Sequence, residues 1–232
     1  MADLVVIVPS RGRPEAAAAL AATFADFCTA DTLLTFAVDE DDPAVPAYSD
    51  LTRSWPQVRV GVADAPSTMV KTLNSAATLD ARLDEPPFAI GFMGDDHRPR
   101  TRGWDATYLE ALHELGTGIV YGNDLLQGHR LPTQCAMTSD IIRALGFMSP
   151  PELRHMYVDN FWRDLGKAAG CLRYLPDVIV EHRHPVAGKA QMDEGYLRVN
   201  APAVYEADER AYAEYGRTRL AGHVAKVQAL RG

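Results

Sequence analysis

Cysteine is scarce in this sequence, and long apolar runs are missing. The three cysteines, Cys28, Cys135 and Cys171, are dispersed and form no Cys-x-x-Cys spacing. A set of this kind is atypical of a disulfide framework or a zinc site, so we expect buried thiols in a reducing compartment. The first apolar run, residues 4–8, stops at Pro9, and no segment approaches the roughly 18 apolar residues of a membrane span. We therefore expect a soluble, cytoplasmic protein without a membrane span.

The sequence also lacks an excess of positive charge. It has 23 Lys and Arg against 31 Asp and Glu, which gives a net charge of -8. This balance argues against a broad basic surface for nucleic acid, although it leaves room for a local basic patch. With 232 residues and 47% hydrophobic content, the chain can bury a sizeable core as one large domain or two small ones. We find no internal repeat and no low-complexity linker.

One apolar run is followed directly by two carboxylates and an imidazole. Residues 88–94 are mostly apolar, and Asp95, Asp96 and His97 come next. The run predicts a buried strand whose polar end emerges at the carboxyl edge of a sheet, where open α/β sheets bind ligands. Adjacent carboxylates repel each other unless a cation or hydrogen-bond donors neutralise them. The stretch indicates either a divalent-metal and diphosphate site or a solvated acidic turn, and spacing alone does not decide between them.

The N-terminus predicts a strand, a loop and a helix. Residues 4–8 are β-branched and apolar, and residues 15–27 are rich in alanine. The loop between them can offer backbone N–H groups, a helix N-terminus and two guanidinium groups to a diphosphate. The alternative is that Arg11 and Arg13 are solvated loop charges.

Two further strands are expected over residues 33–38 and 58–62. The first runs into an acidic cluster, in which Asp39 lies nearest the strand and could accept hydrogen bonds from a base or ribose. A helix then follows Ser67, which we expect to be its N-cap. Lys71 and Asn74 share a face of that helix, where Lys71 either reaches a phosphate or is simply solvated.

Chemistry-bearing residues also gather in two later segments. Asp159 lies among aromatic residues at an expected helix start, so burial could raise its pKa towards the range of a general base. The alternative is an aspartate that interacts with the helix dipole. His182 and His184 end an expected strand and would point to one side in extended chain. Such a pair favours metal binding but also arises by chance.

Three other segments complete the expectations from the residues. Residues 134–137 are expected to form an edge strand, and Ser139 to cap a short helix. Residues 98–104 form a basic knot that includes Trp104; it either contacts an anionic acceptor or offsets the neighbouring acids. Residues 201–230 predict one or two amphipathic helices.

Taken in order, these features resemble the GT-A-type glycosyltransferases, in particular the family 2-like group, over roughly positions 4–190. The segments that carry the resemblance are 6–14, 38–41, 71–74, 93–97 and 157–161. The resemblance implies an α/β fold with a Rossmann-like, mixed but mostly parallel sheet flanked by helices and a C-terminal helical extension. It implies a GT-A-like domain over residues 1–200, with a nucleotide-binding half (1–97) and an acceptor and catalytic half (98–200), before an extension over 201–232.

The resemblance also implies roles for individual residues. The nucleotide-sugar site would comprise Pro9, Ser10, Arg11, Arg13, Asp39, Lys71, Asn74 and Asp95. The Mn²⁺ or Mg²⁺ site would comprise Asp96, His97, His182 and His184. Asp159 would be the catalytic base of an inverting enzyme. The chain departs from the family pattern where His97 occupies the third position of the metal motif and where Val158 precedes Asp159. It thus stays open which of Asp95, Asp96 and His97 binds metal.

The predicted activity is metal-dependent transfer of a hexosyl or pentosyl group from a nucleoside-diphosphate sugar, UDP-sugar first, to a hydroxyl acceptor. The acceptor is a saccharide or, through the basic knot and Trp104, a modified DNA base. Nucleotidyl transfer is a rival, but the first loop has one glycine, Gly12, and no lysine. A non-catalytic nucleotide- or carbohydrate-binding module is a third possibility. The sequence does not indicate an oligomeric state.

Overall fold

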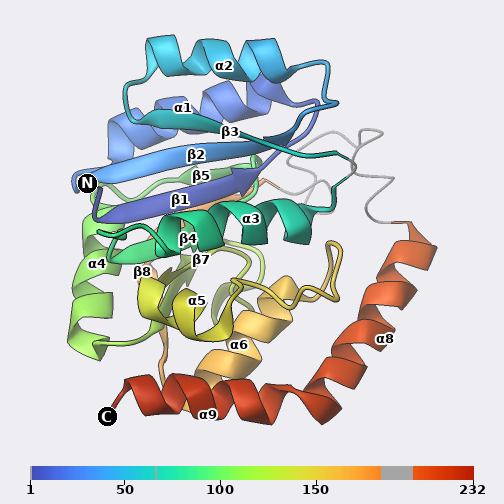
Figure 1. Ribbon diagram of the computed structural model, residues 1–232. Coiled ribbons are helices and arrows are strands. Elements are labelled where there is room, and N and C mark those ends of the chain that lie inside the picture. The colour runs from blue at the N-terminus through green and yellow to red at the C-terminus, as the bar shows by residue number, and fades with distance from the viewer. Residues whose placement is uncertain (1, 66, 184–200) are drawn as a thin grey trace.

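A mixed, mostly parallel β-sheet runs through the protein, as the computed structural model in Figure 1 shows. The structure describes residues 2–65, 67–183 and 201–232. Its strands are β1 (Leu4–Pro9), β2 (Thr32–Asp39), β3 (Val58–Ala63), β4 (Ala89–Phe92), β5 (His97–Pro99), β6 (Ile119–Asn123), β7 (Cys135–Thr138) and β8 (Leu172–His182). They lie in the order β3-β2-β1-β4-β7-β6-β8-β5. The first four strands are parallel, while β7 is antiparallel to both β4 and β6.

Helices cover both faces of this sheet. They are α1 (Pro14–Phe27), α2 (Val45–Ser54), α3 (Met69–Ala81), α4 (Trp104–Leu115), α5 (Ser139–Leu145), α6 (Val158–Ala169), α8 (Pro202–Thr218) and α9 (Leu220–Leu230), with a short 3₁₀ turn η1 (Gly128–Arg130). None of the described helices combines the length and apolarity that crossing a membrane requires.

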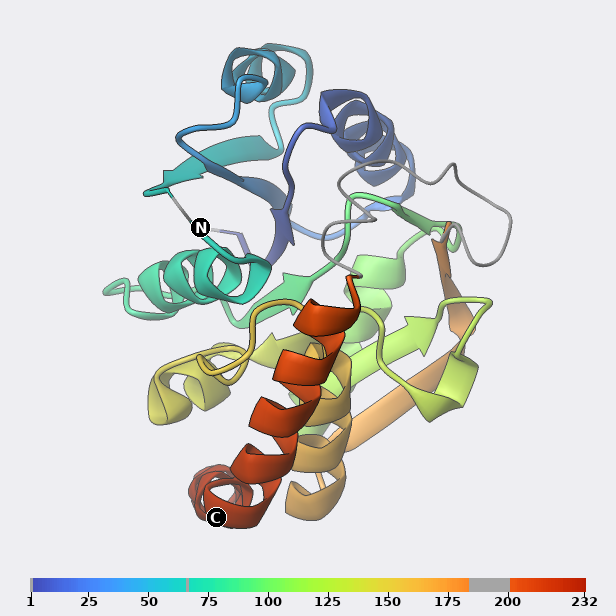
Figure 2. The ribbon, with the colours of Figure 1, turned by 90° about the vertical axis from the view of Figure 1, so that its right-hand side faces the viewer.

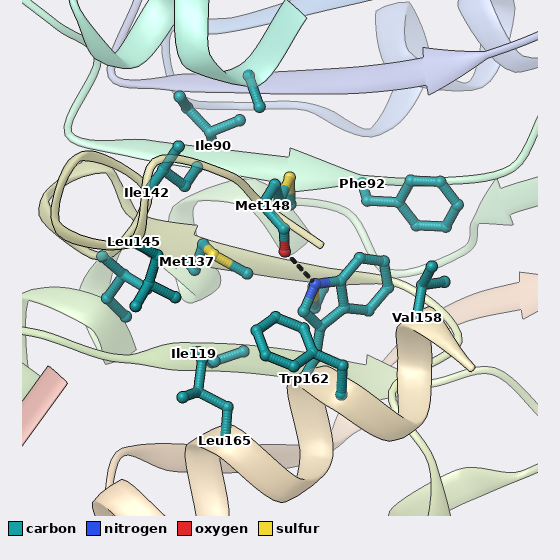
Figure 3. Close-up of a cluster of buried hydrophobic side chains, with 14 of the residues drawn as sticks. Ile90, Phe92, Ile119, Met137, Ile142, Leu145, Met148, Val158, Trp162 and Leu165 are labelled. Atoms are coloured by element: carbon teal, nitrogen blue, oxygen red, sulfur yellow. Dashed lines mark hydrogen bonds between the residues drawn. The ribbon is translucent and has the colours of Figure 1, made fainter. Parts of the chain in front are cut away.

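The core divides into two clusters because successive side chains of a strand point to opposite faces. Along β1, Val5 and Ile7 pack with α3 in one cluster, while Val6 packs with α1 in the other. Figure 3 shows the first cluster, in which Trp162 projects from α6 towards Met148 and Phe92. Its indole Nε1 donates a hydrogen bond of 2.8 Å to the backbone oxygen of Met148, so this buried polar atom is satisfied.

The structure corrects three local predictions. Residues 134–137 do not form an edge strand, because β7 lies inside the sheet and pairs with β4 and β6. Thr68, not Ser67, caps α3, since its Oγ1 accepts a hydrogen bond of 3.2 Å from Lys71 N–H. Thr138 occupies the N-cap position of α5, and Ser139 instead donates to Pro87 O at 2.6 Å.

The C-terminal helices pack on the rest of the chain. Tyr215 of α8 and Val227 of α9 are buried in the same cluster as Trp162. Asp208 of α8 is 1% exposed. These contacts attach residues 201–232 to the sheet's helical layer; the division of the chain at residues 97 and 200 stays a prediction.

Candidate active site

A cleft of about 700 Å³ opens where β1, β2 and β4 end at the carboxyl edge of the sheet. This is the place that parallel α/β topology leaves for a ligand, and the volume suits a nucleotide-sized molecule. The predicted site residues that line it are Pro9, Ser10, Arg11, Arg13, Asp39, Asp95, Asp96, His97, Asp159 and His182. The topology therefore brings together side chains that span most of the sequence.

One wall is the loop after β1, which a buried hydrogen-bond chain braces. Tyr48 OH donates to Ser10 Oγ at 2.7 Å, and Ser10 Oγ donates to Asp95 Oδ2 at 2.6 Å. Arg13 adds an ion pair of 2.9 Å from Nη1 to Asp95 Oδ1, while its backbone N–H donates to Tyr48 OH at 2.9 Å. Burial raises the pKa of Asp95, and the Arg13 charge and the Ser10 hydrogen bond partly oppose this. Asp95 thus holds the loop in place.

Asp39 ends β2 beside the same loop. Its Oδ2 lies 3.0 Å from Arg11 Nη1, and its Oδ1 accepts a hydrogen bond of 3.2 Å from Thr72 Oγ1. Arg11 also pairs with Asp41, whose hydrogen bond raises the pKa of the guanidinium. The two carboxylates fix Arg11 at the rim of the cleft, with its charge retained at any ordinary pH.

The group best suited to hold a metal ion is Asp96 with His97 and His182. One potential ligand atom from each lies within 4.8 Å of the others. Asp96 Oδ1 is 3.4 Å from His97 Nδ1, and Asp96 Oδ2 is 3.3 Å from His182 Nε2. The pairing of β5 with β8 sets the two histidines opposite each other, with ring centroids 4.3 Å apart. This pairing between distant segments creates the group.

The protonation states of Asp96 and His97 suit a metal. Burial would raise the pKa of Asp96, but the neighbouring His182 and His97 outweigh it and hold that pKa well below the usual range. Burial, together with the charge of His182, lowers the pKa of His97 and keeps it neutral. His97 Nε2 is buried and has no hydrogen-bond partner among the described residues. A carboxylate with imidazole nitrogens is a donor set that Mn²⁺ accepts.

Gly94 is required by this arrangement. A Cβ atom at Gly94 would lie 2.6 Å from Asp96 Oδ1 and 3.1 Å from His97 Nδ1. The N–H of Gly94 donates to His97 Nδ1 at 3.0 Å and so fixes the orientation of the ring. The glycine before the acids is therefore part of the site and not only a turn signal.

Asp159 lies on the opposite wall, in the first turn of α6. Its Oδ1 accepts a hydrogen bond of 2.8 Å from Asn160 N–H. Burial raises the pKa of Asp159, against the hydrogen bond from Asn160 and the charges of Arg163 and His182. Tyr157 immediately before α6 has a left-handed φ of 66°, which is unusual for a bulky side chain. Asp159 therefore lines the cleft two residues after a tyrosine whose backbone has an uncommon conformation.

Three predicted site residues are not brought to the cleft by the described structure. Lys71 is exposed and borders a separate depression, as does Asn74. The amide of Asn74 is occupied by the loop before α6: Oδ1 accepts from Met148 N–H and Ser149 N–H, both at 2.9 Å, and Nδ2 donates to Ser149 O at 2.7 Å. His184 lies outside the described residues.

The structure contradicts one part of the role predicted for residues 98–104, which is stacking of Trp104 on a DNA base. Trp104 is 1% exposed and packs against Phe24, so it cannot stack on a base. Arg98 is buried and donates to backbone oxygens, and Arg100 pairs with Glu181 at 2.7 Å. Arg98 thus connects β5 to α1 through Ala16 O, and Arg100 connects the end of β5 to β8.

Sequence patterns gave no signal for several residues that shape the site. Tyr48, Thr72 and Asp208 support the cleft through long-range hydrogen bonds. The segment 154–156, which contains Arg154 and His155, also lines the cleft, and no motif in the sequence marks it.

Comparison with known proteins identifies the fold. No protein-family model and no curated protein sequence matches this chain. Among solved structures, it is similar to a mannosyltransferase, PcManGT from Pyrobaculum calidifontis, in complex with GDP-Man and Mn²⁺, with 12% identity and a TM-score of 0.63 over 99% of this chain and 74% of that one. It is also similar to glucosyl-3-phosphoglycerate synthase from Mycobacterium tuberculosis in complex with Mn²⁺, UDP and glucosyl-3-phosphoglycerate (9%, 0.61, 90% and 80%).

A third similar structure is S. aureus TarS 1–349 in complex with UDP-GlcNAc, with 12% identity and a TM-score of 0.58 over 92% of this chain and 71% of that one. The chain therefore has the GT-A fold of nucleotide-sugar glycosyltransferases, as the order of its sequence features predicts. At these identities the likeness defines the fold alone.

Proposed function

We propose that this protein is a metal-dependent glycosyltransferase that moves a sugar from a nucleoside-diphosphate sugar to a hydroxyl acceptor. The observation that carries the proposal is that one cleft is lined both by the Asp96, His97 and His182 group and by Asp159. The GT-A structures described above bind UDP, UDP-GlcNAc or GDP-Man, which supports a nucleoside-diphosphate donor. We take a UDP-sugar as the first donor to test.

The donor would lie against the loop after β1. Arg11 and Arg13 supply positive charge there, and Ser10 with Pro9 shapes the floor. Asp39 at the end of β2 would accept hydrogen bonds from the base or ribose, in the manner of acids at this edge of α/β sheets. Asp95 would contribute by bracing Ser10 and Arg13. The guanidinium groups would bind the diphosphate through charge-assisted hydrogen bonds.

Asp96, His97 and His182 would hold the metal ion, Mn²⁺ in preference to Mg²⁺ because two of the three ligands are nitrogens. When bound, the ion would neutralise the negative charge of the diphosphate leaving group. His184 follows two residues later in the chain and stays a candidate for a further ligand.

Asp159 would act as the general base. In this step it accepts the proton of the acceptor hydroxyl while the hydroxyl oxygen forms a bond to the anomeric carbon. The bond from that carbon to the phosphate oxygen breaks, and the nucleoside diphosphate leaves with the electron pair, so that the anomeric configuration inverts. The raised pKa of Asp159 makes it a better proton acceptor than an ordinary aspartate. We take a saccharide or small glycoside as the first acceptor to test, since the buried Trp104 cannot stack on a DNA base.

Thermal unfolding with nucleoside-diphosphate sugars, in Mn²⁺ or in EDTA, tests this function first. A donor at about 100 times its Kd should add roughly 2.7 kcal/mol to the free energy of unfolding. We expect one donor to stabilise the protein only with Mn²⁺, and His182→Ala to remove that stabilisation. His129→Ala, an exposed histidine that does not line the cleft, is the matched control and should behave as wild type. Stabilisation that is the same in EDTA would contradict the metal site.

Release of the nucleoside diphosphate on adding an acceptor separates transfer from simple binding. Release of pyrophosphate would instead indicate nucleotidyl transfer. Binding of a donor without turnover of any acceptor would indicate a binding module on the same fold.

A further inference from the structure

Asp208 of α8 holds the backbone of a segment that forms one wall of the cleft. Its carboxylate accepts three hydrogen bonds from successive backbone N–H groups: Arg154 at 3.0 Å, His155 at 2.8 Å and Met156 at 2.7 Å. Asp208 itself is 1% exposed. A buried carboxylate that accepts several N–H groups fixes their positions closely, because each donor it loses would be left unsatisfied. Figure 2 shows α8 alongside α6, with the chain that precedes α6 against it.

The same segment is fixed from its other side. Val70 N–H, in the first turn of α3, donates to Arg154 O at 3.1 Å, and Leu153 is buried in the core. Residues 154–156 are thus clamped between α3 and α8. They lead directly into Tyr157 and then to Asp159 in the first turn of α6.

The backbone of Tyr157, directly after the clamped segment, has a conformation that its surroundings must stabilise. A tyrosine with φ of 66° costs free energy and persists only where its surroundings determine it. The ring of Tyr157 packs against two tyrosines of α8, with ring centroids 5.4 Å from Tyr205 and 5.5 Å from Tyr212. The contacts of α8 therefore fix both the backbone before Tyr157 and its side chain.

Buried aspartates with similar bonds elsewhere provide the comparison. Asp105 is fully buried and accepts hydrogen bonds from Thr29 N–H, Ala30 N–H and Thr32 Oγ1 at 2.8–3.2 Å. It belongs to the first turn of α4, binds the chain that leads into β2, and does not line the cleft. Asp105 and Asp208 are thus both buried and both accept backbone N–H groups, but only Asp208 binds a segment that lines the cleft.

We propose that Asp208 is a positioning residue for glycosyl transfer: it fixes segment 154–156 so that the first turn of α6 presents Asp159 to the acceptor hydroxyl. This inference rests on the proposed function. In this proposal α8 supports the part of the site that binds the acceptor, while β1, β2 and the loops after them form the part that binds the donor.

Isosteric substitution tests this role. Asp208→Asn keeps the size of the side chain but turns an NH₂ group towards backbone N–H donors, so that the segment loses part of its anchor. Displacement of a reacting group by about 1 Å can cost on the order of 100-fold in rate. We expect kcat to fall roughly 10- to 100-fold while the affinity for the donor, measured by calorimetry, stays within about twofold. Asp208→Glu retains the charge and should recover part of kcat.

Asp105→Asn is the matched control, because it makes the same change at an equally buried carboxylate away from the cleft. It should lower the Tm but leave the kcat of the folded protein within about twofold of wild type. Equal losses of kcat in the two variants would overturn the proposal, and so would a full kcat in Asp208→Asn.

Hydrogen exchange of the backbone amides supplies a readout that needs no activity. In Asp208→Asn, the amides of residues 154–160 should exchange faster, and in Asp105→Asn they should not. Unchanged exchange in Asp208→Asn would refute the positioning role even if kcat fell. If the wild type transferred no sugar, the proposed function would fail and Asp208 could not be a positioning residue for transfer; faster exchange would then show that the clamp alone is real.

Discussion

Asp159 is subject to opposing requirements at the scale of a single residue. The proposed role as a base requires the ionised form, yet burial favours the protonated form and raises the pKa of Asp159. In the folded protein it therefore binds a proton up to a higher pH than in the unfolded chain. Between the two pKa values the folded state holds more protons, so the free energy of unfolding falls as pH rises through this range. At neutral pH the ionised carboxylate lowers the free energy of unfolding, and the proposed base role requires this ionised form.

Asp159→Asn should separate these effects. We expect kcat to fall by roughly 10²- to 10⁴-fold, the usual contribution of general acid–base catalysis. The Tm at neutral pH should stay the same or rise, because the neutral amide avoids the cost of a charge in this position. Sugar-transfer assays and thermal unfolding measure the two quantities. A variant that kept near-wild-type turnover would show that another group accepts the proton.

The pH dependence of transfer should follow the same residue. We expect kcat to decline on the acid side as Asp159 becomes protonated, with the midpoint above the value of about 3.9 that is typical of an aspartate. The profile is measured with the metal and donor at saturation, so that their binding does not limit the rate. An acid limb at the ordinary aspartate value would contradict the effect of burial.

At the scale of an element, the loop after β1 depends on a residue that lies in a different helix. Tyr48 of α2 is fully buried, and its hydroxyl connects Ser10 with the backbone of Arg13. The strand alone does not fix the conformation of this loop, because Gly12 within it has a left-handed φ of 69° and leaves the chain flexible. The packing of α2 on α1 supplies the missing constraint.

Tyr48→Phe should therefore weaken donor binding. Loss of the hydroxyl leaves Ser10 and Arg13 N–H each without one partner, at a cost of about 1–3 kcal/mol. We expect the KM for the donor to rise roughly tenfold, with a smaller effect on the KM for the acceptor. Tyr108→Phe removes a buried hydroxyl that donates to Gln134 at 2.6 Å outside the cleft, and it should leave both KM values unchanged. Equal changes in the two variants would argue against the bracing role.

At the scale of the whole molecule, the cluster of Figure 3 joins the sheet to α6, the helix that carries Asp159. Trp162 of α6 is fully buried and lies 5.1 Å from Phe92 of β4, between ring centroids. Phe92 itself lines the cleft. The packing of α6 against β4 thus sets the distance between Asp159 and the edge of the sheet that carries Asp96 and His97.

Trp162→Ala should be strongly destabilising. A cavity of this size in a packed core costs roughly 3–5 kcal/mol, and each kcal/mol lowers the Tm of a chain of this length by about 2–4 °C. Trp55→Ala, at a partly exposed position at the end of α2, should cost much less. Chemical unfolding of both variants measures the difference. A loss below about 1 kcal/mol for Trp162→Ala would show that the cluster collapses around the gap.

The sequence by itself determined the elements and the edge at which the site lies. Runs such as Leu4–Pro9 and Ala89–Phe92 form strands because their side chains are apolar throughout, and such strands are buried on both faces. The acids that follow them must emerge at the carboxyl edge, whatever the strand order. This is why Asp39, Asp95 and Asp96 were predicted to lie at one edge before any tertiary contact was known.

Only the tertiary structure decided which polar residues meet. The stack of His97 on His182 depends on the pairing of β5 with β8, and the bonds of Asp208 depend on the return of α8 to the cleft. Residues more than 50 positions apart make these contacts, and a local pattern contains no information about them. The same reason applies to Trp104 and Asn74. Their residue types suit ligand binding, but in the folded protein Trp104 is buried and the amide of Asn74 binds the backbone of a distant loop.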